Sequence, residues 1–306
     1  MKKNDFIFIG NGLFAAEVLN NLVHLKLIPF LIITQNKKTK KEINSPVFNV
    51  ALKNKLPLIQ ITKINQKINF LKTQKVKVFV VADYGEKISA SLLKIPQLGC
   101  LNLHPSLLPL YRGPSPIQSS ILNGELKTGV TLIKMDEKID HGPIIAQEKI
   151  NLSSQDNYLS LLYKLSELGA NLLAKNLILY LENKIKPKPQ NHKRATYSSL
   201  IKKEDGRINW QKEAVIIERQ IRAFYPWPGS YTFWNNKLLK ITKGKIYSNN
   251  FYLEPGRVFR TENQEIAVAT TKKSLIINKL QLEGKKELPA SEFIKGYPQI
   301  IGSILK

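Results

Sequence analysis

The chain has 306 residues, of which 43% are hydrophobic and 8% aromatic, values typical of a folded protein rather than a disordered one. This length is enough for one large domain or two ordinary domains, each with its own core. A single cysteine, Cys100, excludes an intramolecular disulfide framework and is typical of a reducing compartment. No run of about 18 apolar residues is present, so we expect no membrane span and a cytoplasmic location.

The formal net charge is +24, from 47 Lys and Arg against 23 Asp and Glu. Residues 185–306 contain 23 basic and 10 acidic side chains, a net +13, whereas the longer segment 1–184 contains 24 and 13, a net +11. Such an excess indicates a polyanionic partner such as nucleic acid, because each neutralised phosphate releases counterions. A Lys-, Ile- and Asn-rich composition also arises from genomic bias, so charge alone leaves the partner open.

Short apolar, β-branched runs alternate with helical patterns over residues 1 to about 150. Strands are expected at 6–9, 29–34, 56–60, 76–82, 99–103 and 129–135, and helices at 14–25, 47–54, 89–93 and 115–123. Strands that are buried on both faces and separated by helices predict an α/β fold with a mostly parallel sheet. The segment 156–180 has leucines at helical spacing and predicts one long packed helix.

The composition changes after this helix. Prolines and basic side chains in the following segment predict an extended, solvent-exposed linker. Beyond it, a helix is expected at 213–224 and short strands at 237–241, 256–259, 265–269 and 274–282, a pattern typical of a small β-barrel or sandwich. We therefore expect a domain at 1–182, a basic linker at 183–206 and a C-terminal barrel domain at 207–306.

The motif GNGLFA at Gly10–Ala15 follows the first expected strand and partly matches a dinucleotide-binding fingerprint. That fingerprint needs an acidic residue at the end of the second strand to hold a ribose, but residues 33–36 read Ile-Thr-Gln-Asn. The motif therefore predicts a tight strand-to-helix turn and gives little support to a nicotinamide dehydrogenase.

Asn102 and His104 lie two residues apart on an expected strand, so their side chains point to the same face. Burying two polar side chains on a strand costs free energy unless they are hydrogen-bonded or serve a function. Both a structural and a catalytic role are therefore open. Asp140 follows in a loop after the next expected strand, and side chains at the carboxyl ends of parallel strands converge on the ligand crevice of α/β proteins. An amide that donates to an oxyanion, an imidazole that moves protons and a carboxylate beside it suit attack by an amine on a carbonyl.

The run NLHPSLLP at 102–109, with Asp140 36 positions after His104, resembles the formyltransferase family that uses 10-formyltetrahydrofolate. The resemblance implies a Rossmann-like formyltransferase domain followed by an OB-like barrel. It implies that the catalytic residues are Asn102, His104 and Asp140. It also implies a folate site at Ser106, Leu107, Leu108 and Pro109, with the loops 82–88 and 137–143 packed against the pterin.

Further stretches resemble the methionyl-tRNA formyltransferases within that family, at 45–60, 194–210, 221–231 and 280–296. This resemblance implies formyl transfer to the α-amino group of methionine on initiator tRNA, by a monomer. Where that family usually carries a basic loop with arginine, the segment 36–44 is shorter and has lysine instead of arginine. Candidates for phosphate contact, with an ordinary solvated surface as the alternative, are Lys37, Lys38, Lys40, Lys41, Lys285 and Lys286.

Two other functions stay open. One is formyl transfer to a nucleotide-linked amino sugar, and the other is non-catalytic RNA binding by an α/β scaffold. No metal is expected, because the four histidines show no ligand spacing with one another or with Cys100. His141, next to Asp140, either tunes that carboxylate or covers the loop.

Overall fold

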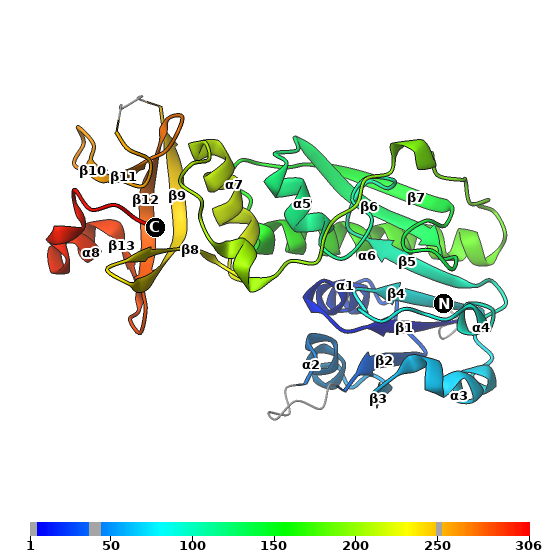
Figure 1. Ribbon diagram of the computed structural model, residues 1–306. Coiled ribbons are helices and arrows are strands. Elements are labelled where there is room, and N and C mark those ends of the chain that lie inside the picture. Colours follow the sequence, from blue (N-terminus) through cyan, green and yellow to red (C-terminus); the bar gives the residue numbers. More distant parts are fainter. Residues whose placement is uncertain (1–4, 37–43, 249–252) are drawn as a thin grey trace. The chain divides into compact units, whose positions relative to one another are not determined.

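The computed structural model describes residues 5–36, 44–248 and 253–306, which form two compact units (Figure 1). The first unit contains Met1–Pro116, Leu126–Asn151 and Leu161–Ser199, and the second contains Ile117–Glu125, Leu152–Ser160 and Leu200–Lys306. Residues 183–199 thus group with the first unit, although the sequence predicts that they belong to a linker. The candidate phosphate contacts at Lys37, Lys38, Lys40 and Lys41 lie outside the described residues.

The first unit is built on a seven-stranded sheet with the order β3-β2-β1-β4-β5-β6-β7. The strands are β1 (Phe6–Gly10), β2 (Leu31–Gln35), β3 (Leu58–Ile61), β4 (Val78–Ala82), β5 (Cys100–His104), β6 (Lys127–Lys134) and β7 (Ile144–Asn151). The first five run parallel, and β6 and β7 are antiparallel to their neighbours. The prediction of a mostly parallel α/β sheet is confirmed. β7 was not predicted, because an edge strand with one buried residue has no strong apolar pattern.

Helices cover this sheet. They are α1 (Leu13–His24), α2 (Pro46–Lys53), α3 (Ile68–Thr73), α4 (Ala90–Leu93), α5 (Pro116–Leu122, which crosses into the second unit) and α6 (Tyr158–Leu181, whose first turn belongs to the second unit). On α6, a Cβ at Gly169 would lie within 4 Å of Val130, Phe14 and Leu103, so α6 and α1 pack over the same side of β5 and β6. The opposite side of β5 carries Cys100, which belongs to a core cluster with residues of α3 and α4.

The motif at Gly10–Ala15 forms a tight turn between β1 and α1. The backbone N–H groups of Asn11 and Gly12 donate to the Asp83 carbonyl over 3.1 and 3.0 Å. A Cβ at Gly12 would overlap the Asp83 carboxylate, so a larger residue there would displace the Asp83 side chain. The turn that the sequence predicted is thus explained by packing of this loop against the end of β4.

The second unit is an antiparallel half-barrel with the strand order β10-β11-β12-β9-β8, and β13 pairs with β12. Its elements are α7 (Ala214–Phe224), β8 (Ser230–Trp234), β9 (Lys237–Tyr247), β10 (Val258–Arg260), β11 (Ile266–Ala269), β12 (Ser274–Leu282), β13 (Glu287–Pro289) and α8 (Ala290–Gly296). Residues 302–306 form backbone hydrogen bonds with both Phe233 on β8 and Val258 on β10, so one segment bridges the two edge strands. The core beneath contains Trp210, Trp234 and Phe293.

Candidate active site

The structure brings together the three residues that the sequence singles out for chemistry. Asn102 and His104 share one face of β5, where they are paired with Ile133 and Thr131 of β6. Asp140 lies in the loop between β6 and β7. Its Oδ1 accepts from Asn102 Nδ2 over 3.2 Å, and its Oδ2 lies 3.5 Å from His104 Nδ1. One carboxylate therefore contacts both partners, one with each oxygen.

His104 is 4% exposed and is held at both ring nitrogens. Its Nε2 lies 2.9 Å from the Tyr111 carbonyl oxygen. Because a carbonyl oxygen only accepts, Nε2 carries the proton in this contact, and Nδ1 faces the Asp140 carboxylate. A second proton taken up on Nδ1 would lie between the imidazole and the carboxylate, which is a suitable arrangement for transient proton storage.

The position of Asp140 is fixed by its neighbours as well as by its own side chain. Its backbone has φ +49°, an uncommon conformation for a residue with a side chain. Its Oδ2 accepts a hydrogen bond from the backbone N–H of Gly113 over 2.8 Å. Gly113 has φ +104°, and a Cβ there would lie 2.8 Å from the Ser198 carbonyl oxygen. Only glycine allows the chain to pass Ser198 this closely while it donates to Asp140.

The four residues expected at a folate site form a tight turn after β5. The Ser106 hydroxyl is buried and donates to the Leu110 carbonyl over 2.6 Å, and the Ser106 carbonyl accepts from Thr131 Oγ1 over 2.6 Å. Leu108 is also buried, and its peptide bond to Pro109 is cis. Leu107 and Pro109 are half-buried. The buried residues Ser106 and Leu108 thus stabilise the turn. Of the four residues, only Leu107 and Pro109 have surface that a ligand could contact.

The loop after β4, expected to lie against a pterin, is well anchored. Tyr84 is buried, and its burial, followed by the nearby Glu86 carboxylate, raises the pKa of the Tyr84 hydroxyl. Glu86 in turn accepts from Gln35 Nε2 over 3.0 Å and from the Ile64 N–H over 3.2 Å. This loop is therefore braced against β2 and the segment after β3. Its role with a pterin stays a prediction.

Sequence reasoning missed two further residues at the site, Arg112 and Gln190. Arg112 is 2% exposed and donates to Gln190 Oε1 over 2.6 Å. Gln190 is 6% exposed, and its Nε2 donates to the carbonyls of Asp140 and Gly142 over 2.9 and 2.7 Å. One feature of the sequence could have pointed to Arg112: it is a lone basic residue between an apolar run and a proline-rich segment. Gln190 had none, because it lies 78 positions away in a polar segment.

His141 contacts groups other than the Asp140 carboxylate. Its Nδ1 lies 2.6 Å from Asp136 Oδ2, and its ring stacks on His192 with centroids 4.0 Å apart. His192 Nδ1 lies 2.9 Å from an Arg112 nitrogen, and desolvation, followed by His141 and Arg112, lowers the pKa of His192. A neutral His192 can accept from Arg112. His141 thus covers the loop, one of the two interpretations that the sequence left open.

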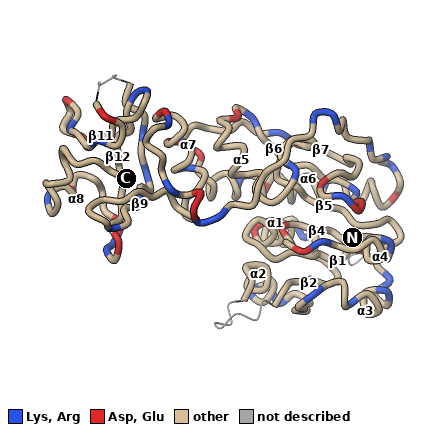
Figure 2. The backbone as a smooth tube through the Cα atoms, in the orientation of Figure 1, with Lys and Arg blue, Asp and Glu red and all other residues tan. Residues whose placement is uncertain are grey.

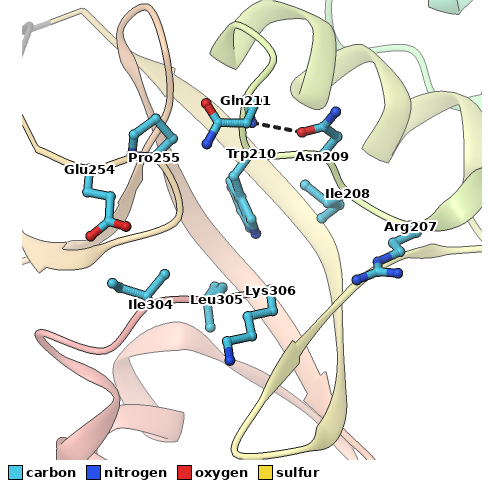
Figure 3. A pocket seen from close by; sticks show the side chains of 10 residues that line it. All are labelled: Arg207, Ile208, Asn209, Trp210, Gln211, Glu254, Pro255, Ile304, Leu305 and Lys306. Atoms are coloured by element: carbon cyan, nitrogen blue, oxygen red, sulfur yellow. Dashed lines mark hydrogen bonds between the residues drawn. The ribbon is translucent and has the colours of Figure 1, made fainter.

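A separate cavity of about 520 Å³ lies in the second unit (Figure 3). Its lining is Arg207, Ile208, Asn209, Trp210, Gln211, Glu254, Pro255, Ile304, Leu305 and Lys306. Figure 3 shows the Trp210 side chain amid these groups, and its Nε1 donates to Thr232 Oγ1 over 3.0 Å. All of these lining residues belong to the second unit, so the cavity is distinct from the candidate residues around Asp140.

Lys and Arg residues occur along the chain in both units, as the blue positions on the backbone tube of Figure 2 show. Lys285 and Lys286 are exposed at the turn between β12 and β13, and neither forms an ion pair with any described residue. Within the described part of the chain, no group of His, Cys, Asp and Glu is arranged to hold a metal ion. The helices described there include none long and apolar enough to cross a membrane.

Two family models match this chain. Residues 3–177 match "Formyl transferase", and residues 200–298 match "Formyl transferase, C-terminal domain". The chain is 39% identical to methionyl-tRNA formyltransferase of Methylacidiphilum infernorum, with 98% of this chain and 97% of the relative covered. It is 37% identical to the protein of that name from Chloroflexus aurantiacus, with 95% and 96% covered.

Solved structures share the fold. An N-formyltransferase from Helicobacter canadensis, solved with folinic acid and dTDP-3-aminofucose, superposes with a TM-score of 0.66 at 20% identity and covers 90% of this chain and 98% of its own. HypX from Aquifex aeolicus, solved with tetrahydrofolic acid, gives 0.65 at 16% identity, with 97% of this chain and 48% of its own covered. The family models and the close full-length relatives agree, and the chain belongs to the methionyl-tRNA formyltransferases of the formyltransferase family.

Proposed function

We propose that this protein transfers the formyl group of 10-formyltetrahydrofolate to the α-amino group of methionine on initiator tRNA. The observation that carries the proposal is the shared carboxylate of Asp140, which contacts Asn102 and His104 at the carboxyl end of β5. Family membership supports both the formyl chemistry and a folate co-substrate.

The reaction joins the amine nitrogen to the formyl carbon and breaks the bond between that carbon and N10 of the folate. One proton passes from the amine to N10, so the net reaction needs no oxidant or reductant. The carbonyl oxygen carries negative charge in the tetrahedral intermediate, and donors aimed at that oxygen lower the barrier. Three tasks follow for the protein: holding the oxyanion, moving the proton and excluding water.

We assign the oxyanion to Asn102 and the proton to His104 with Asp140. One amide hydrogen of Asn102 is used by Asp140, and the second has no partner among the described residues, so it is available to an incoming oxygen. His104 Nδ1 can take the amine proton, with Asp140 3.5 Å away to stabilise the imidazolium that forms. The same proton then goes to the leaving nitrogen. A positioned acid–base group typically contributes ~10²–10⁴-fold to the rate.

We assign the folate to the turn that follows β5, where Leu107 and Pro109 offer exposed surface and Ser106 and Leu108 hold the turn in shape. The basic second unit, with Lys285 and Lys286 at its exposed turn, is assigned to tRNA. We expect the protein to act as a monomer in the cytoplasm. Gel filtration with light scattering tests the oligomeric state.

A direct assay tests the proposal. The protein is incubated with 10-formyltetrahydrofolate and either initiator or elongator methionyl-tRNA, and N-formylmethionine is measured after mild hydrolysis. Formylation of the initiator at a much higher kcat/KM than the elongator is expected. No formylmethionine from either tRNA would refute the proposal.

An amino sugar linked to a nucleotide is the competing acceptor. Salt separates the two, because a protein that neutralises several phosphates loses affinity steeply as ionic strength rises. A KM for tRNA that rises steeply between about 50 and 200 mM salt (~10³-fold or more if about six phosphates are neutralised) is expected. Turnover of a nucleotide-linked amino sugar in place of tRNA would identify the other acceptor.

A further inference from the structure

The segment 187–199, called the connector here, is bound along its length to the candidate site. The Ile144 and Lys188 backbones exchange hydrogen bonds of 2.7 and 2.8 Å just after the Asp140 loop. At the other end, the Arg112 N–H donates to the Thr196 carbonyl over 2.9 Å, and the Ser198 N–H donates to the Arg112 carbonyl over 2.7 Å. Most residues of the connector are exposed, as the sequence predicts, but Gln190 is buried and the connector is not a free linker.

Gln190 is the point at which the connector reaches the Asp140 loop. Its single amide nitrogen donates to the backbone carbonyls of Asp140 and Gly142, which lie on either side of His141. Two short bonds to one loop restrict the orientation of the peptide groups that follow Asp140 and Gly142. Because Asp140 has φ +49°, its backbone needs such restraint to stay in an unfavourable conformation.

Arg112 in turn holds Gln190 in place. Its guanidinium is buried and has no carboxylate within ion-pair distance among the described residues; its partners are Gln190 Oε1, His192 Nδ1 and, at 3.5 Å, the Tyr197 hydroxyl. Its Nε has no hydrogen-bond partner in the part of the chain that the structure describes. A buried cation without a counterion destabilises the fold, so its position indicates a task other than stability.

The residues on either side of Arg112, Tyr111 and Gly113, contact the candidate catalytic residues and so indicate the role of Arg112. The Tyr111 carbonyl contacts His104 Nε2, and the Gly113 N–H donates to Asp140 Oδ2. The backbone of Arg112 itself is bonded to the connector at both its N–H and its carbonyl. The segment 111–113 thus contacts His104 and Asp140 on one side and the connector on the other, while the Arg112 side chain reaches Gln190.

We propose that Gln190, held by Arg112, is a positioning residue that fixes the Asp140 carboxylate for proton transfer, so that the connector is a working part of the active site. This inference rests on the function proposed above. It predicts that loss of the Gln190 donor lowers kcat and leaves the KM for methionyl-tRNA unchanged, because the tRNA-binding surface is untouched.

Gln190→Glu is the most informative variant. The carboxylate keeps the size of the side chain and can pair with Arg112, which preserves or raises the thermal unfolding temperature. It cannot donate to the carbonyls of Asp140 and Gly142 and would repel them. We expect kcat to fall ~10–100-fold, since small misplacements at a reacting centre have effects of that size. Asn191→Ala is the matched control, because the adjacent Asn191 is exposed and no described contact involves its side chain.

Four measurements are made on each variant: kcat, KM for tRNA, KM for the folate and the unfolding temperature. Wild-type kcat in a folded Gln190→Glu protein would overturn the inference, as would an effect confined to KM. If Gln190→Glu does not fold, Gln190→Met, which also lacks a donor and is similar in size, replaces it with the same expected decrease in kcat. Activity in the wild type and inactivity of His104→Ala establish the proposed function independently, so an unaffected Gln190 variant refutes only this inference.

Discussion

Around Asp140 the polar side chains are buried and hydrogen-bonded to one another. On the sheet of the second unit, charged side chains are exposed to solvent and form surface ion pairs. His104 and Arg112 are 4% and 2% exposed. In the second unit, the side chains of the Lys245–Glu265 pair are 55% and 34% exposed, with nitrogen and oxygen 2.9 Å apart.

This difference in burial predicts different roles for the polar groups of the two regions. Buried groups in fixed geometry need no reorganisation when charge develops, so each can have a large effect on a rate. Exposed charges are screened by salt, and a single pair contributes little, typically ~0–1 kcal/mol. Single substitutions of the buried polar groups around Asp140 should therefore act on kcat, and those of exposed lysines that contact tRNA should act on affinity in small, salt-dependent steps.

The largest effects are expected at the acid–base pair. His104→Ala and Asp140→Asn should each lower kcat by ~10²–10⁴-fold, because each removes one partner of the proton relay. Since the two act as a unit, the double variant should be little worse than either single one. Formylation kinetics on folded protein provide the measurement, with His24→Ala, an exposed residue of α1, as the control. Near-normal turnover in both single variants would show that His104 and Asp140 are not the acid–base pair.

An intermediate effect is expected at Gly113. With φ +104° and the Ser198 carbonyl oxygen 2.8 Å from the position of a Cβ, Gly113→Ala should destabilise the protein by about 1–3 kcal/mol. It should also lower kcat, because the N–H that donates to Asp140 would shift. Denaturant unfolding and kinetics measure the two effects. Gly296→Ala, where a Cβ would meet no described atom within 4 Å, should change neither.

The smallest effects are expected on the second unit. The double variant Lys285→Ala/Lys286→Ala should weaken tRNA binding a few-fold with kcat unchanged. It should also reduce the slope of log affinity against log salt by up to ~1 for each phosphate that is no longer neutralised. Lys245→Ala is the control, since Lys245 is already paired with Glu265. Equal slopes in wild type and double variant would remove Lys285 and Lys286 from the binding surface.

The two regions also differ in how far the sequence could predict them. β5 was expected at its place, and the spacing of Asn102 and His104 put them on one face, because side chains alternate along a strand. β8 was missed since it buries a serine and a threonine beside a tryptophan, which gives no apolar alternation. The small β domain was predicted from the segments that form β9, β10, β11 and β12, which bury apolar residues in its core.

By itself the sequence determined the class of fold, the second domain and the family, because apolar periodicity and local motifs are properties of neighbouring residues. Only the tertiary structure decided that Asp140 bonds both Asn102 and His104, and that Gln190 and Arg112 hold its loop. These contacts join residues 38, 50 and 78 positions apart. Such pairs are brought together by the order of the strands and by the return of the connector to the Asp140 loop, and no local pattern encodes that path.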